Sequence, residues 1–122
     1  MDKKLVDQVV NALAKQQLYD LVNRIERACE WTDDLVMDVY CALYGPAHET
    51  RIVLRVFRAY FKDMYDSGFS ESVKLTEFCD NAPRMLDTLT TDEMDVWISK
   101  CHDLMHELQD MKHRFFAPLC RR

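Results

Sequence analysis

The sequence ETRIVLRVFRAYFKDMYD, residues 49–66, decides the fold that we expect for this chain. At about 100° per residue, a helix over this stretch places its cations in one narrow stripe and apolar side chains over most of the remaining surface. The basic stripe is Arg51, Arg55, Arg58 and Lys62, and the apolar residues are Val53, Leu54, Phe57, Tyr60, Phe61 and Met64. We therefore predict that this helix is the buried centre of the fold.

Length and composition are those of one helical domain. A chain of 122 residues can bury roughly two thirds of its unfolded surface around one core. Its 48% apolar and 30% charged residues are typical of a folded protein, and two glycines with three prolines are too few for many tight sheet turns. We predict an all-α fold, a single-domain bundle of about six helices spanning residues 1–122.

Cysteine usage and hydropathy indicate the compartment. The five cysteines are odd in number and form no C-x-x-C pair, so they suggest neither a disulfide framework nor a zinc ribbon. The longest apolar run has six residues, 39–44, which is far too short to cross a membrane. No signal-peptide pattern opens the chain. We expect a cytoplasmic or nuclear protein, without a membrane anchor.

The N-terminal third predicts three helices. Apolar stripes over residues 5–13 and 18–29 point about 150° apart, so we expect a break near residues 15–17. Thr32 is a candidate cap of the third helix, which Gly45 and Pro46 would end. The central helix would then begin as early as Pro46.

The stretch after the central helix is ambiguous. Ser67 and Gly68 would end that helix, and residues 69–80 fit a short helix better than a strand, although Val73 and Leu75 alternate as in a strand. A further short helix is expected after residues 81–83. Its apolar residues would be Met85, Leu86 and Leu89.

A capping box, Thr90 with Glu93, opens the longest regular pattern in the chain. We expect this helix to end at Pro118. Seven-residue spacing relates Met94, Cys101, Leu108 and Phe115, and Trp97, Leu104 and Met111 occupy the second heptad position.

This heptad pattern has two interpretations. Ile98 and Met105 widen the apolar stripe, which favours packing against the central helix. The alternative is a seam for self-association or a protein partner, with Trp97 and Phe115 as large anchors.

The basic stripe also has alternatives. Residues 69–111 hold ten acidic and three basic residues, so we expect the stripe to face solvent or pair within the chain. An acidic protein partner is the second interpretation. Nucleic acid is the third, and four cations on a chain of net charge −5 disfavour it.

Metal binding and catalysis receive little support from the sequence. His102 and His106 have the i, i+4 spacing of two metal ligands on one helical face, and His113 follows them. Further ligands would have to come from elsewhere, with Asp110 and Cys120 as nominal candidates. We therefore predict surface histidines, no metal site and no cofactor. The chain lacks nucleophile and phosphate-loop motifs, so we expect no enzyme, and a metal-dependent enzyme stays the remote alternative.

One family resemblance follows from residues 47–75. The spacing of Val53-Leu54, Tyr60-Phe61, Met64, Ser67-Gly68-Phe69 and Glu71-Ser72, with Ala47-His48 upstream, resembles the helical hairpin of the BTB/POZ domain. The resemblance implies an α+β fold, with a strand at Val73 and Leu75, and a role in homodimerisation or partner recruitment. Two extra residues after His48 depart from the family pattern.

These observations favour a small intracellular protein-interaction module, such as an adaptor, assembly factor or regulator, able to self-associate. The expected partner-binding residues are Arg51, Arg55, Arg58, Lys62, Trp97 and Phe115. The small size and the missing catalytic motif also lead us to expect a viral or mobile-element source.

Overall fold

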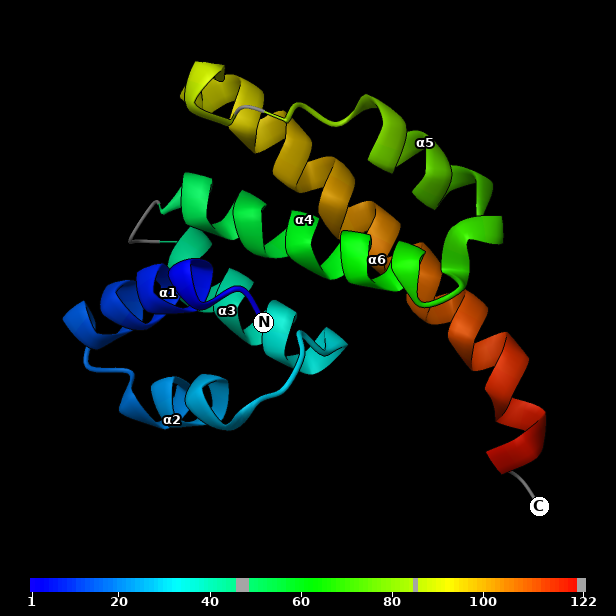
Figure 1. The fold of residues 1–122 in the computed structure, drawn as a ribbon, viewed down its shortest axis with the longest axis horizontal. Coiled ribbons are helices and arrows are strands. Elements are labelled where there is room, and N and C mark those ends of the chain that lie inside the picture. The colour runs from blue at the N-terminus through cyan, green and yellow to red at the C-terminus, as the bar shows by residue number, and fades with distance from the viewer. Residues whose placement is uncertain (46–48, 85, 121–122) are drawn as a thin grey trace.

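The described chain is entirely helical. The computed structural model describes residues 1–45, 49–84 and 86–120, with side chains described up to residue 111. Six α-helices and two short 3-10 helices, with no strand, make up these residues (Figure 1). The all-α prediction is confirmed. In chain order the elements are α1 (Lys3–Lys15), α2 (Tyr19–Arg27), α3 (Asp33–Tyr44), α4 (Thr50–Asp66), η1 (Phe69–Glu71), α5 (Val73–Asn81), η2 (Leu86–Thr88) and α6 (Thr91–Cys120).

Helix α4 is the buried centre, as predicted. It contacts α1, α3, α5 and α6. In Figure 1, α1 and α3 lie on one side of α4 and α5 on the other, and α6 crosses it. Its buried side chains are those of Thr50, Val53, Leu54, Val56, Phe57, Tyr60, Phe61 and Met64. The expected start at Pro46 falls outside the described residues, and the helix begins at Thr50. It ends at Asp66 with Ser67 as its C-cap, after which Gly68 adopts a left-handed φ of 117°.

Helices α1 and α3 pack against α4, and α2 packs on α1 and α3. The turn between α1 and α2 confirms the predicted break. Asp2 caps α1 by accepting from the Lys4 backbone N–H. Gln17 has a φ of 61° between α1 and α2, which turns the chain without glycine or proline. Thr32 caps α3 by accepting from the Leu35 N–H at 3.3 Å.

Residues 69–89 form a helix and turns. Ser72 accepts from the Leu75 N–H and opens α5, so the helical interpretation of residues 69–80 is confirmed. The further short helix is reduced to the single turn η2, because Thr90 already starts the next helix and leaves room for little more. Leu86 is buried there, Leu89 is partly buried, and Met85 lies outside the described residues.

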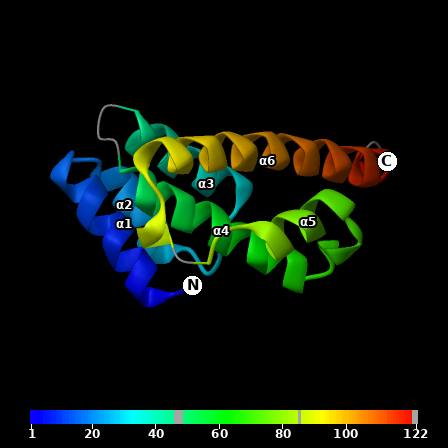
Figure 2. The same ribbon diagram turned by 90° about the horizontal axis from the view of Figure 1, so that it is seen from above.

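Helix α6 packs along α4 (Figure 2). Its capping box is confirmed: the Thr90 N–H donates to Glu93 Oε1, and the Glu93 N–H donates to Thr90 Oγ1, both at 3.2 Å. The expected end at Pro118 is wrong, since α6 continues to Cys120. Proline removes one backbone hydrogen bond of a helix, but it fixes φ at about −65°, which is a helical value, so the chain can stay helical past it.

The heptad face of α6 points into the core over most of its length. Met94, Ile98, Cys101, Leu104, Met105 and Leu108 are all buried. Met111 is 45% exposed, because the last turns of α6 run past the other helices (Figure 1). The core interpretation of the heptad is therefore confirmed as far as Leu108. None of the described helices combines the length and apolarity that a membrane span requires.

Candidate partner-binding groove

Three residues of the basic stripe of α4, Arg55, Arg58 and Lys62, line an open groove of about 870 Å³, whereas Arg51 lies outside its lining. The walls come from the start of α1 and from the chain between the end of α5 and η2. Apolar side chains such as Leu5, Ala59 and Phe78 alternate with charged ones. The groove contains five cations, Lys4, Arg55, Arg58, Lys62 and Arg84, and three carboxylates, Asp2, Asp66 and Asp80.

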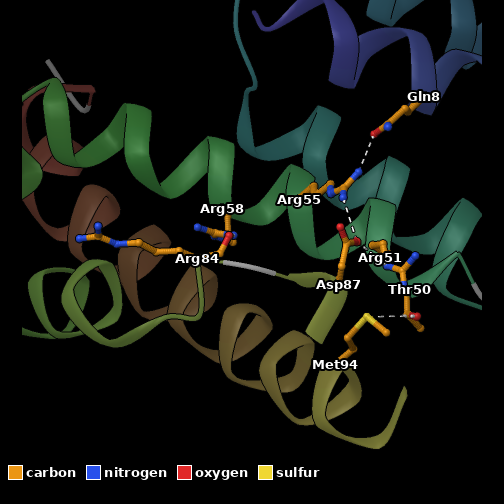
Figure 3. Close-up of polar contacts among 8 residues, drawn as sticks. All are labelled: Gln8, Thr50, Arg51, Arg55, Arg58, Arg84, Asp87 and Met94. Atoms are coloured by element: carbon orange, nitrogen blue, oxygen red, sulfur yellow. Dashed lines mark hydrogen bonds and ion pairs between the residues drawn. The ribbon is translucent and has the colours of Figure 1, made fainter. Parts of the chain in front are cut away.

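Two arginines of the stripe pair within the chain. Asp87, in η2, forms an ion pair with Arg51 Nε at 3.5 Å and accepts a hydrogen bond from Arg55 Nη2 at 3.4 Å (Figure 3). Arg55 also donates to Gln8 Oε1 at 3.2 Å, which links α4 to α1. The expected pairing with the acidic half of the chain is therefore confirmed for these two residues. Such partly exposed ion pairs contribute under about 1 kcal/mol each.

The other half of the stripe has no carboxylate partner among the described residues. Arg58 is half-buried and donates to the backbone carbonyl of Arg84 at 3.1 Å (Figure 3). Burial lowers the pKa of Arg58, and the like charges of Arg55 and Arg84 lower it further. Lys62 and the Arg84 guanidinium are exposed and make no hydrogen bond or ion pair in the described structure. This end of the groove therefore holds three cations that form no ion pair among the described residues, and Asp2, Asp66 and Asp80 also line the groove.

Trp97 lies apart from the groove. Its ring packs against Phe78 of α5 at a centroid distance of 6.0 Å, and Lys100 Nζ lies 4.6 Å from its ring centre. Phe78 in turn packs against Phe61, so Trp97 belongs to the edge of the core. The structure therefore brings three cations of the stripe, Arg55, Arg58 and Lys62, into the groove, but it does not bring Trp97 to them. The side chain of Phe115, the second expected anchor, lies outside the described residues.

Two cations of the groove were not among the expected site residues. Lys4 reaches it from the N-terminus of α1, and Arg84 from the turn before η2. The only sequence signal for Arg84 was its rarity, as one of three basic residues in an acidic half. Its position beside Arg58 depends on how α5 packs, which no local pattern predicts.

His102 and His106 form a separate pair on α6. Their Nε2 atoms lie 3.2 Å apart and their ring centroids 4.4 Å apart. His106 is exposed, as predicted, whereas His102 is half-buried against the ring of Tyr40 at 5.4 Å. The described residues contain no group of three or more His, Cys, Asp or Glu side chains arranged for a metal ion. The Cys120 side chain lies outside the described residues.

No family model, curated protein or solved structure matches this chain. The resemblance to the BTB/POZ domain over residues 47–75 stays a prediction. The strand that it implies is not formed, because Val73 and Leu75 lie in α5. The α+β alternative is therefore not the fold of the described residues.

Proposed function

We propose that this chain is a protein-interaction module whose groove binds an acidic segment of a partner protein. The observation that carries the proposal is the cluster of Arg58, Lys62 and Arg84, three cations in an open groove without a carboxylate partner among the described residues. A carboxylate of the partner would replace the missing counter-charge. Charge-assisted hydrogen bonds to arginine are about twice as strong as neutral ones.

The position of Arg58 favours a specific contact over general attraction. Its hydrogen bond to the Arg84 carbonyl and its partial burial restrict the guanidinium before any partner arrives. A side chain that is ordered in advance loses less conformational entropy on binding. Lys62 and Arg84 are exposed and would steer an acidic segment towards it.

The carboxylates in the groove favour a peptide over a nucleic acid as the ligand. Asp2, Asp66 and Asp80 stand among the five cations. A phosphate backbone would have to pass these acids, whereas a peptide can place an acidic residue opposite a cation and a basic or neutral one opposite an acid. A protein partner is therefore the better match. In this role the chain would act as an adaptor or regulator in the cytoplasm or nucleus.

The test is a matched pair of charge reversals. Lys62→Glu with Arg84→Glu removes two exposed groove cations, and Lys15→Glu with Arg27→Glu removes two exposed cations at the ends of α1 and α2. Both variants change the net charge equally. Thermal unfolding checks that both remain folded.

Each protein would carry a photo-crosslinking amino acid at Ala82, which lines the groove, and would be irradiated in native cells. The same partner protein should be crosslinked to the chain without charge reversals and to the α1/α2 control. It should not be crosslinked to the groove variant. Its crosslinked segment, made as a synthetic peptide, should be acidic, and its affinity should fall as salt rises. A neutral or basic segment, a crosslinked nucleic acid, or equal recovery with both variants would contradict the proposal.

A further inference from the structure

We propose that His102 and His106 form a two-histidine site for a divalent first-row transition-metal ion, namely Cu²⁺, Ni²⁺ or Zn²⁺. The site lies on the face of α6 that packs against Tyr40 of α3, so it is independent of the groove formed by α1, α4 and α5. The protein supplies two ligands, and water or a side chain of a partner fills the remaining positions.

The distance between the two Nε2 atoms fits one shared ion. Metal–imidazole bonds are about 2.0–2.1 Å long. Two nitrogens 3.2 Å apart therefore enclose an N–metal–N angle of about 100–105° at such an ion. This value lies between the right angle of square-planar or octahedral coordination and the tetrahedral angle, so only a small ring movement reaches any of these geometries. Helical spacing alone puts the rings on one face, but it does not make their Nε2 atoms converge.

The first ligand is held in place by the core. The His102 ring packs on Tyr40, whose ring stacks on Tyr44 at 5.2 Å and meets the edge of Phe57 at 5.7 Å. This row of aromatic rings restricts the orientation of His102 before a metal binds. His106 is exposed and can adjust to complete the chelate.

The donor set selects the class of ion. Imidazole nitrogen suits copper, nickel and zinc, whereas calcium and magnesium require oxygen ligands. The adjacent carboxylate Glu107 is engaged by Lys74 Nζ at 2.6 Å. A hydrogen bond between two neutral imidazoles also accounts for a 3.2 Å separation. In that state one ring donates and the other accepts, and a metal ion would replace the shared proton and bind both lone pairs.

The test is a metal titration of the untagged protein after chelator treatment. Calorimetry with Cu²⁺, Ni²⁺ and Zn²⁺ should show saturable binding of one ion, tightest for Cu²⁺. His106→Ala should weaken Cu²⁺ binding by about tenfold or more, because the second ligand of a chelate binds at high effective concentration. His113→Ala is the matched control, since it removes a histidine seven residues further along, and it should leave the affinity unchanged.

A second measurement locates the ion without a variant. Paramagnetic Cu²⁺ should broaden the backbone amide NMR signals around residues 102–106 before all others. This readout does not require removal of the His102 ring, whose packing on Tyr40 a substitution would disturb. Absence of saturable binding, an equal loss in His113→Ala, or broadening centred elsewhere in the chain would overturn the proposal and leave only an imidazole hydrogen bond.

Discussion

Truncation of Phe57 tests whether α4 is the centre of the fold. The side chain is fully buried. Its ring stacks near Phe61 at a centroid distance of 6.1 Å and meets Tyr40 at 5.7 Å, so it joins α4 to α3. Phe→Ala at such a site costs about 3–5 kcal/mol, the lost transfer free energy plus the cavity. A domain of this size has a total stability of about 5–15 kcal/mol, so Phe57→Ala should remove a large share of it.

Urea unfolding followed by far-ultraviolet circular dichroism measures this loss. With a slope of about 1–3 kcal/mol per molar urea, the midpoint should fall by about 1 M or more. Phe57→Leu keeps most of the volume and should cost about 1–2 kcal/mol. Val73→Ala changes a side chain that is 69% exposed and should stay within about 0.5 kcal/mol. A loss under about 1 kcal/mol in Phe57→Ala, or an equal loss in Val73→Ala, would refute the central position of α4.

Two further predictions concern single residues. Gly68→Ala should cost about 1–2 kcal/mol in the same assay, because φ is 117° there and no neighbouring atom lies within 4 Å of an added Cβ; an unchanged midpoint would contradict a left-handed turn after α4. Among the described cysteines, a thiol reagent should modify the exposed Cys29 and Cys41 first and Cys101 only on unfolding, because Cys101 is buried. Burial also raises the pKa of the Cys101 thiol. Below the thiol pKa of the unfolded chain, about 8.5, the thiol is protonated in both states. Above that pH only the unfolded chain loses the proton, so the free energy of unfolding decreases. Cys101→Ala should flatten that alkaline decrease in the urea midpoint, and an identical slope would refute the assignment.

The sequence predicted those parts of the fold that depend on local chemistry. Thr32 and Thr90 could be recognised as caps because a cap satisfies backbone N–H groups only three residues away. The wide apolar surface of residues 49–66 indicated the central helix for a similar reason, since the positions of apolar residues in the sequence determine which face of a helix is apolar. The end of α6 was missed, because the φ that proline fixes is itself a helical value and the chain can stay helical past it.

The candidate site depended on tertiary structure to a greater degree. The sequence by itself determined that Arg51, Arg55, Arg58 and Lys62 share one face of a helix. Only the packing of η2 and the end of α5 decided that Asp87 neutralises the first two and that Arg84 adds to the charge beside Arg58. Likewise, the spacing of His102 and His106 was visible in the sequence, but contact with Tyr40 fixes one ring. The physical reason is that the effect of a charge or a metal ligand depends on its distance to groups that are far away in the sequence. Those distances are set only when the helices pack.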